Sequence, residues 1–418
     1  MDPSWPANLT PRLEELYRDL HRHPELSFQE RRTAEIVTAW VRGLGYEVHE
    51  RIGGTGVAAV LANGDGPVIA LRADMDALPV LEATGLEYAS TARATDAAGA
   101  EVPVMHACGH DMHVTCLLGA AATLASTRAQ WAGTLVLLFQ PAEETAQGAQ
   151  AMLDDRLYDR VPRPHVVLGQ HVAPLPAGYL GLRPGPSWAA SDSLRITLHG
   201  AGGHGSRPET TVDPVLLAAS TVQRLHTIVS REVPAADTAV LTVGASRSGT
   251  KANIIPDSAE LLVNIRSYTP EVRNRVLTAL QRVVAGEAAA AGTPRPPEIE
   301  HLESAPTLTN DPAATERTVA ALEQVVGPGH VVDHGPLPSS EDVPHLADAV
   351  DAPLTFWLLG GADPALFATA RSAEDVRAIT AIQPSNHSPS YAPVLQPTIT
   401  IGVRALTAAA RAWLAGPA

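Results

Sequence analysis

The stretch HACGHDMHV, residues 106–114, places three histidines, a cysteine and an aspartate within nine positions. It leads directly into a helix-like, apolar stretch from about residue 111 to 126. A lone cysteine or histidine is usually structural, and neither packing nor solubility requires so many reactive side chains together. The density of the cluster therefore indicates a functional site at the start of a helix.

Apolar runs with β-strand character surround this segment and predict the fold of the main domain. They lie at 57–62, 67–73, 133–139 and 165–170. Because continuously apolar strands alternate with helices, they predict an α/β domain in which helices cover both faces of a mixed, mostly parallel sheet. The run TFWLL at 355–359 and a helix at about 396–415 return to the same style near the end of the chain.

Two amphipathic helices are expected before the first strand. Thr10 is the predicted N-cap residue of the first helix, with Pro11 as its first helical residue. SFQE at Ser27–Glu30 has the pattern of a capping box for the second helix, which should end near residues 43–45.

Residues 187–303 follow a different order from the rest of the chain. Strand-like and helix-like segments there alternate as βαββαβ, from SDSLRITLHG at 191–200 to a last strand near 297–302. That order is typical of a ferredoxin-like α+β domain. We therefore expect a discontinuous main domain, residues 1–186 and 304–418, that carries residues 187–303 as an insertion.

Composition limits the partners that this chain can have. Its 418 residues carry a formal net charge of −15, which repels nucleic acid and anionic membrane surfaces. The N-terminal sequence MDPSWPANLTPRLEELY lacks the cationic start and apolar core of a signal peptide, and no stretch holds 18 uninterrupted apolar residues. These features predict a cytoplasmic protein whose two cysteines, Cys108 and Cys116, are free thiols.

Reactive residues directly follow three of the predicted strands. They are Asp74 and Asp76, the pair Glu143 and Glu144, and His171. Ligands of open α/β sheets bind at the carboxyl ends of the strands, so these side chains are expected to converge on one site.

Cys108 and His110 lie two residues apart and offer a thiolate and an imidazole, donors that suit zinc and its neighbours. Cys108 as a nucleophile activated by a neighbouring histidine is the alternative. The adjacent Glu143 and Glu144 favour the metal, because one carboxylate can bind it while the other holds the attacking water and carries its proton.

GAGGHG at residues 200–205 fits the glycine pattern of a dinucleotide site after a strand. That fingerprint needs a helix opening on the glycines and an acidic residue about 20 positions later. Residues 206–208 continue as a loop, and residues 220–228 hold no acid. We therefore expect the glycines to allow close approach of a ligand and to expose His204.

Seven stretches, in order, resemble the two-metal metallopeptidases that include aminoacylases and carboxypeptidases. The similarity is greatest to the branch of hippurate hydrolases and indole-acetyl-amino-acid hydrolases. The matching stretches are RADMDALPV (72–80), HACGHDMHV (106–114), FQPAEE (139–144), GQHV (169–172), GAGGHGSRPE (200–209), GTKANIIPD (249–257) and NHSPSY (386–391).

The resemblance implies a set of metal ligands and their supporting residues. The implied ligands are Cys108, His110, Glu144, His171 and His387. Glu143 would be the general base, and Asp76 would orient the metal site. Five protein donors exceed the three that a single catalytic zinc normally takes, so two divalent ions, zinc, manganese, cobalt or nickel, are expected.

In this family the insertion acts as a lid and dimerisation surface, which implies a homodimer. His204 would reach the scissile carbonyl, in its own or the partner subunit, while Asn253 and Arg266 would hold the carboxylate of the substrate. A guanidinium matches a carboxylate in a two-point fork, although an exposed strand arginine is also common.

The sequence departs from the family pattern around the expected substrate pocket and not among the ligands. The departures are Gly205, Ser206, Glu209 and Val343. The expected activity is metal-dependent hydrolysis of N-acyl amino acids, with deacetylation of a biosynthetic intermediate or carboxypeptidase action on short peptides as alternatives. A catalytically silent binding relative is the non-enzymatic alternative, but Glu143 and every implied ligand are present.

Overall fold

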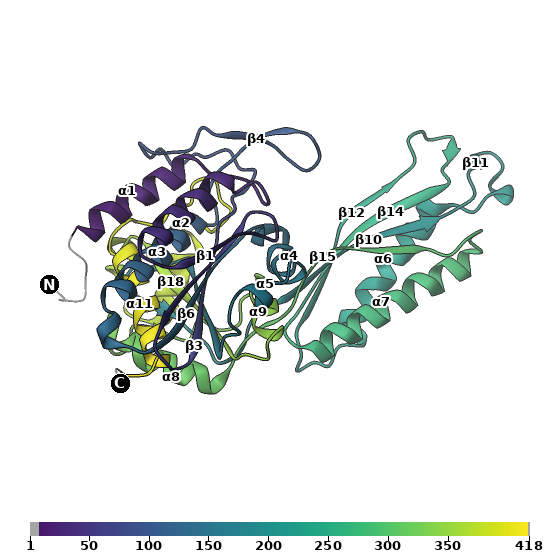
Figure 1. Cartoon of the computed structure of the whole chain (residues 1–418). Helices are drawn as coiled ribbons and strands as arrows, with labels where there is room; N and C mark the ends of the chain where they lie inside the picture. The colour runs from purple at the N-terminus through teal and green to yellow at the C-terminus, as the bar shows by residue number, and fades with distance from the viewer. Residues whose placement is uncertain (1–7, 417–418) are drawn as a thin grey trace. The chain divides into compact units, whose positions relative to one another are not determined.

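The computed structural model describes residues 8–416, which form two compact units (Figure 1). The first unit contains the chain up to Gly185, Thr309–Gly335 and the chain from Asp342 onward; the second contains Pro186–Leu308 and Pro336–Glu341. Residues 304–308 and 336–341, which were predicted to belong to the main domain, thus cluster with the insertion. Residues 1–7, which begin the N-terminal segment considered above for a signal peptide, lie outside the described residues.

An eight-stranded sheet forms the centre of the first unit. Its strands, in spatial order, are β1 (Glu47–Ile52), β2 (Gly56–Asn63), β6 (Gly133–Gln140), β3 (Val68–Asp74), β7 (Val166–Pro176), β18 (Leu354–Ala362), β8 (Leu180–Gly181) and β17 (Val331–Val332). The four central strands, β6, β3, β7 and β18, run parallel, whereas β1, β2 and β6 pair antiparallel. The prediction of a mixed, mostly parallel sheet is confirmed.

Helices flank this sheet on both sides (Figure 1). Those whose apolar side chains join the main core are α1 (Leu9–Arg22), α2 (Arg31–Gly43), α3 (His110–Ser126), α8 (Pro312–Val326) and α11 (Thr398–Trp413). The remaining helices of the unit are α4 (Gly148–Asp154), α5 (Leu157–Arg160), α9 (Pro344–Asp348) and α10 (Ala373–Ala381). Among residues 8–416, no helix has the length and apolar character needed to cross a membrane.

Strand β3 sends its side chains alternately to the two faces of the sheet. Ile69 and Leu71 join the core beneath α3 and α11. Arg72 and Asp74 face the other way and are equally buried, because Arg72 Nη1 lies 2.7 Å from Asp74 Oδ2 and Arg72 Nη2 lies 3.3 Å from Asp342 Oδ1. A buried arginine is tolerated in this strand because carboxylates pair with it.

The second unit has a four-stranded antiparallel sheet with two helices. In chain order its elements are β10 (Ala190–His199), α6 (Pro214–Arg231), β12 (Ala239–Ser248), β14 (Ser258–Ser267), α7 (Pro270–Ala291) and β15 (Glu298–Ala305). The spatial order β12-β14-β10-β15 is that of a ferredoxin-like sheet. Alternate residues such as Leu194, Ile196 and Leu198 form its separate core. The predicted fold of the insertion is confirmed.

Shorter elements complete the two units. They are β4 (Arg93–Thr95), β5 (Glu101–Pro103), β9 (Gly185–Trp188), β11 (Gly203–His204), β13 (Ile254–Ile255) and β16 (Leu308–Asn310). Strands β4 and β5 form an antiparallel pair in the first unit, and β11 pairs with β13 in the second.

The predicted start of the first helix is wrong. Helix α1 begins at Leu9, and Asn8 occupies the N-cap position that was assigned to Thr10. Strand β1 was not predicted, since its sequence EVHERI is mostly polar and its side chains are largely solvent-accessible at the edge of the sheet. A strand that is not buried on both faces lacks the continuous apolar run from which the other strands were predicted.

The predicted capping box at Ser27–Glu30 is also wrong. Helix α2 begins at Arg31 without a side-chain cap, because both polar side chains bind elsewhere. Ser27 Oγ donates to Asp76 Oδ2 at 2.7 Å, and Glu30 Oε1 accepts from Ala142 N at 2.8 Å. A buried carboxylate needs such partners more than an exposed helix end needs a cap.

Helices α3 and α11 approach closely at two glycines. A Cβ atom on Gly119 of α3 would overlap Cγ2 of Val403, and one on Gly402 of α11 would lie 2.5 Å from Cys116 Sγ. The packing of α3, which carries the reactive cluster at its start, therefore depends on the absence of these two side-chain atoms.

Gly119→Ala and Gly402→Ala should each lower the free energy of unfolding, by about 1 to 3 kcal/mol, because overpacking outweighs the better helix propensity of alanine. Gly43→Ala is the matched control: Gly43 ends α2, and nothing lies within 4 Å of the new Cβ. Urea denaturation followed by circular dichroism should show the control unchanged or slightly stabilised. Equal effects of all three substitutions would contradict this account of the α3–α11 contact.

Candidate metal centre

Donor atoms of the predicted ligands gather in three overlapping groups in the first unit. Within each group, all donor atoms lie within 4.8 Å of one another. The groups are Cys108, His110 and His171; Cys108, Glu144 and His387; and His110, Glu143 and Glu144. All five predicted ligands and the predicted general base thus belong to one continuous cluster.

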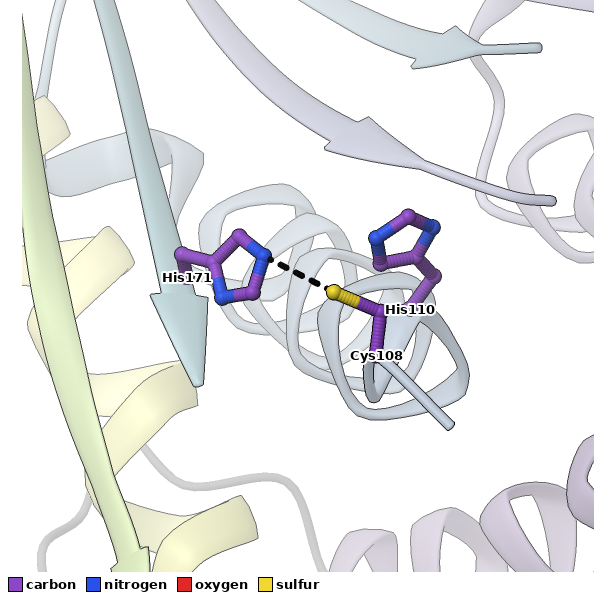
Figure 2. A group of neighbouring side chains, drawn as sticks. All are labelled: Cys108, His110 and His171. Atoms are coloured by element: carbon purple, nitrogen blue, oxygen red, sulfur yellow. Dashed lines mark hydrogen bonds between the residues drawn. The ribbon is translucent and has the colours of Figure 1, made fainter. Parts of the chain in front are cut away.

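Cys108 and His110 flank the turn that opens α3. Gly109 between them has a φ angle of 86°, and a Cβ atom there would lie 2.5 Å from Val172 Cγ1. Glycine is required on both counts. Figure 2 shows the result: Cys108 and His110 present their side chains beside His171.

His171 lies inside β7, so the prediction that it follows the end of this strand is wrong. The strand continues to Pro176, beyond the last residue that pairs with its neighbour β3. That last pair joins Arg72 of β3 to Gly169 of β7. His171 is therefore level with the carboxyl end of β3, which is where a strand-end residue was expected to lie.

Hydrogen bonds fix which ring nitrogen of each histidine faces the cluster. His171 Nδ1 donates to the carbonyl of Val172 at 2.8 Å, which leaves Nε2 3.4 Å from Cys108 Sγ (Figure 2). His110 Nδ1 lies 3.2 Å from Asp76 Oδ1. Metal-binding histidines commonly donate their second ring nitrogen to a carbonyl or carboxylate in this way.

Asp76 joins His110 to the segment that carries the glutamates. Its Oδ2 accepts from the backbone N–H of Glu144 at 3.0 Å and from Ser27 Oγ at 2.7 Å, while Oδ1 contacts His110. Asp76 thus contacts both the ring of His110 and the backbone of Glu144, as a residue that orients two predicted ligands would. Nothing in the strand pattern identified Ser27 as its partner.

His113 and Asp74 form a second supporting pair that the sequence analysis did not assign. His113 Nδ1 lies 2.5 Å from Asp74 Oδ1, and His113 Nε2 accepts from the backbone N–H of Val172 at 2.8 Å. The pair therefore holds the backbone of Val172, the residue whose carbonyl orients His171. The sequence placed His113 in the cluster 106–114 and Asp74 after a strand, and His113 follows His110 by three residues and so lies on the same side of α3, but nothing in it paired the two.

The backbone around residue 387 completes the cluster. His387 Nε2 lies 3.3 Å from Glu144 Oε2, and His387 has a φ angle of 71°, which is uncommon for a residue other than glycine. Its N–H donates to the carbonyl of Ala107 at 2.8 Å. Asn386 Nδ2 donates to the carbonyls of Cys108 and Val172. The segment is thus tied to the turn before α3 and to β7.

The cluster is rich in carboxylates, and these raise the pKa values of two of the predicted ligands, Cys108 and His110. Burial lowers the pKa of His110, but Asp74 and Asp76 outweigh it and raise that pKa to about 10. Burial and the carboxylates of Glu144 and Glu143 raise the pKa of the Cys108 thiol. The cluster therefore favours cations.

Two buried atoms test whether these residues fit a metal. Within the described chain, neither His110 Nε2 nor Glu144 Oε1 has a hydrogen-bond partner. Buried polar atoms seldom lack partners, and these two atoms, which are of types that bind metals, lie 3.7 Å apart. The donor set of thiolate, imidazole and carboxylate fits divalent first-row metals.

The predicted substrate residues belong to the second unit. His204 is exposed on β11, where it pairs with Ile254 of β13, and its Nδ1 accepts from Ser206 N at 3.1 Å. Asn253, also exposed, accepts from the Gly205 N–H at 2.9 Å, so His204 and Asn253 share one local structure.

Arg266 lies on β14 and donates to the carbonyl of Pro338 and, at 3.2 Å, to Ser340 Oγ. Residues 336–341 of the insertion unit thereby position its guanidinium. Val343 is completely buried in the first unit, so the departure from the family pattern at this position changes packing and offers no surface to a substrate.

Comparison with known proteins agrees with this geometry. The profile of peptidase family M20/M25/M40 matches residues 70–380. A hippurate hydrolase from Campylobacter jejuni is 39% identical over 334 residues, which cover 79% of this chain and 83% of the relative. An N-acetylcysteine deacetylase from Bacillus subtilis is 37% identical over 303 residues, which cover 72% of this chain and 76% of the relative.

A crystal structure of a dinuclear metal-binding M20 peptidase from Bacillus subtilis has the same fold. Its TM-score is 0.73 at 29% identity, and the match covers 96% of this chain and 97% of that one. The family profile spans most of the chain and includes the predicted ligands Cys108, His110, Glu144 and His171, whereas His387 lies beyond the matched range. The chain therefore belongs to peptidase family M20/M25/M40, and is a metal-dependent amidohydrolase or peptidase.

Proposed function

We propose that this protein hydrolyses the amide bond of N-acyl amino acids and releases a carboxylic acid and a free amino acid. The observation that carries the proposal is the cluster itself, in which an additional carboxylate, Glu143, lies beside two of the five donors, His110 and Glu144. Similarity to a hippurate hydrolase and to an N-acetylcysteine deacetylase supports a small N-acyl conjugate as substrate, hippurate-like or N-acetylated.

Cys108, His110, Glu144, His171 and His387 would hold two divalent ions of zinc, manganese, cobalt or nickel. When bound, such ions lower the pKa of water and polarise the amide carbonyl. Glu144 would contribute to holding the ions from the middle of the donor set, because its two oxygens face different partners: Oε1 lies 3.7 Å from His110 Nε2, and Oε2 lies 3.3 Å from His387 Nε2.

Glu143 is the proposed general base. Its Oε2 lies 3.8 Å from His110 Nε2, and its side chain is 10% exposed, so the carboxylate borders the donors while remaining accessible to water. It would take a proton from the attacking water and pass it to the leaving amine. Because Glu143 is next to the ligand Glu144, the same carboxylate can carry out both proton transfers from one place beside the donors.

The insertion would bind the substrate and form a homodimer. His204 would donate to the oxyanion that develops on the scissile carbonyl, and Asn253 and Arg266 would hold the free carboxylate of the substrate. The exposed position of His204 and the anchored guanidinium of Arg266 support these roles. The negative charge disfavours nucleic acid and anionic membrane surfaces as partners. The proposed substrate is a small molecule, and the proposed location is the cytoplasm.

The alternatives to this function differ in what they require of the site. A deacetylase or a short-peptide carboxypeptidase would use the same centre on another acyl group. A Cys108 nucleophile requires a lowered thiol pKa, whereas burial and the neighbouring carboxylates raise the pKa of Cys108. A silent binding protein would have no need of Glu143 beside a complete donor set.

Glu143→Gln should keep the metals and lower kcat by about 10²- to 10⁴-fold, because an amide holds a water but cannot accept its proton. Glu144→Gln, the adjacent control, should instead lose metal. Elemental analysis and hydrolysis of hippurate and N-acetyl amino acids measure both effects. Near-normal turnover by Glu143→Gln would contradict its role as the base.

Metal loading should release about two protons per chain near pH 7, because the pKa values of Cys108 and His110 are both raised in the metal-free protein while metals bind their deprotonated forms. Metal affinity should therefore rise with pH. Titration of zinc into weakly buffered apoprotein with a pH indicator measures the release. Cys108→Ser should release about one proton fewer; an unchanged count would exclude Cys108 as a ligand.

Mixing His204→Ala with Glu143→Gln should restore part of the activity if His204 serves the partner subunit. Each variant alone should be nearly inactive, His204→Ala through a roughly 10²-fold or larger loss of kcat. A mixed dimer contains one site with both residues intact. Mass spectrometry must show subunit exchange; an inactive mixture of exchanged dimers would contradict the shared site.

A further inference from the structure

His21, near the end of α1, lies between two buried carboxylates outside the donor cluster. Its Nδ1 is 2.6 Å from Asp111 Oδ2, and its Nε2 is 3.1 Å from Glu82 Oε1. The side chains of all three residues are at most 1% exposed. None of them has a part in the hydrolysis proposed above.

The triad carries charge at neutral pH. Burial lowers the pKa of His21, but its hydrogen bonds to Asp111 and Glu82 outweigh burial and raise that pKa to about 9. Loss of the imidazolium would leave two carboxylates buried without their cation. Burying two negative charges without a cation is strongly unfavourable, so the side chain of Asp111 or Glu82 would move toward water or toward another cation.

Asp111 connects the triad to the ligands of α3. It directly follows His110 in the first turn, and its Oδ1 accepts from the backbone N–H of Met112 at 2.9 Å. Although Asp111 is a carboxylate next to a metal ligand, it belongs to none of the donor groups found among residues 8–416. Its Oδ2 contacts His21 instead.

Glu82 connects the triad to two further segments of the site. It lies six residues beyond Asp76, and its Oε2 accepts from the Ser90 N–H at 2.6 Å. The neighbouring Ala83 N–H donates to the carbonyl of Pro389 at 2.7 Å, two residues past His387. The loop that holds one side of His21 therefore contacts the segment that carries the fifth donor.

We propose that His21 is a positioning residue of the metal centre. By pairing Asp111 with Glu82 it fixes the first turn of α3, so that Cys108 and His110 present their donors and Asp111 stays out of the metal site. This inference rests on the proposed metal centre. It assigns His21 no contact with substrate or with the reacting atoms.

His21→Gln tests the inference, with His199→Gln as the matched control. His199 is also a buried histidine paired with a carboxylate, Glu298, but it belongs to the insertion. Cobalt binding is measured by competition, and the sulfur-to-cobalt charge-transfer absorption reports on Cys108. His21→Gln should weaken cobalt binding about 10- to 100-fold and change this absorption. The control should keep affinity and spectrum even if its melting temperature falls.

Asp111→Asn and the double variant separate positioning from general stability. If His21 acts through Asp111, the double variant should lose no more cobalt affinity than the more affected single variant. Unchanged affinity and spectrum in His21→Gln would overturn the inference. If His21→Gln does not fold, unchanged binding by Asp111→Asn overturns it equally.

Cobalt binding by the wild-type protein separates a failure of the proposed metal centre from a failure of the positioning role of His21. Failure of the wild type to bind cobalt, or an absorption that survives Cys108→Ser, would refute the proposed metal centre itself. Normal binding by the wild type together with normal binding by His21→Gln would refute only the positioning role of His21.

Discussion

The burial of four carboxylates around His110 is the constraint on which the first unit depends. Asp74 and Asp76 are completely buried, and Glu143 and Glu144 are nearly so. Carboxylates enter a protein interior only when cations or hydrogen-bond donors compensate them. Arg72 satisfies Asp74 from within β3, and Ser27 and the Glu144 N–H satisfy Asp76. The remaining charge faces the thiol and imidazole donors, where divalent ions would compensate it.

The positions of the donor side chains are set mainly by the backbone segments that carry them. Strand β7 passes the end of β3, so a mid-strand histidine lies level with the carboxyl end of its neighbour. The backbone of Val172 then contacts both histidines: its N–H donates to His113 and its carbonyl accepts from His171. Gly109 lets the turn before α3 pack against the same residue. The backbone of β7 thus fixes donors that come from different segments.

The sequence predicted the elements whose burial produces a clear pattern. The central strands, the ferredoxin-like order of the insertion and the convergence of the ligands all follow from apolar runs and from where reactive residues interrupt them. The partners within the buried polar networks could not be predicted from the sequence. Ser27 and Glu30 matched a capping box, yet they support buried groups far along the chain. The pairing of Asp74 with His113, or of His21 with Asp111 and Glu82, depends on tertiary contacts that spacing does not encode.

The central claim is that Cys108, His110, Glu144, His171 and His387 hold two divalent ions at one buried site. Anomalous diffraction from crystals of zinc-loaded protein, measured on both sides of the zinc absorption edge, tests it most directly. We expect two strong peaks within this cluster, bordered by these five side chains, with Glu144 contacting both. A single peak, or zinc bound elsewhere while the cluster stays empty, would contradict the two-metal account.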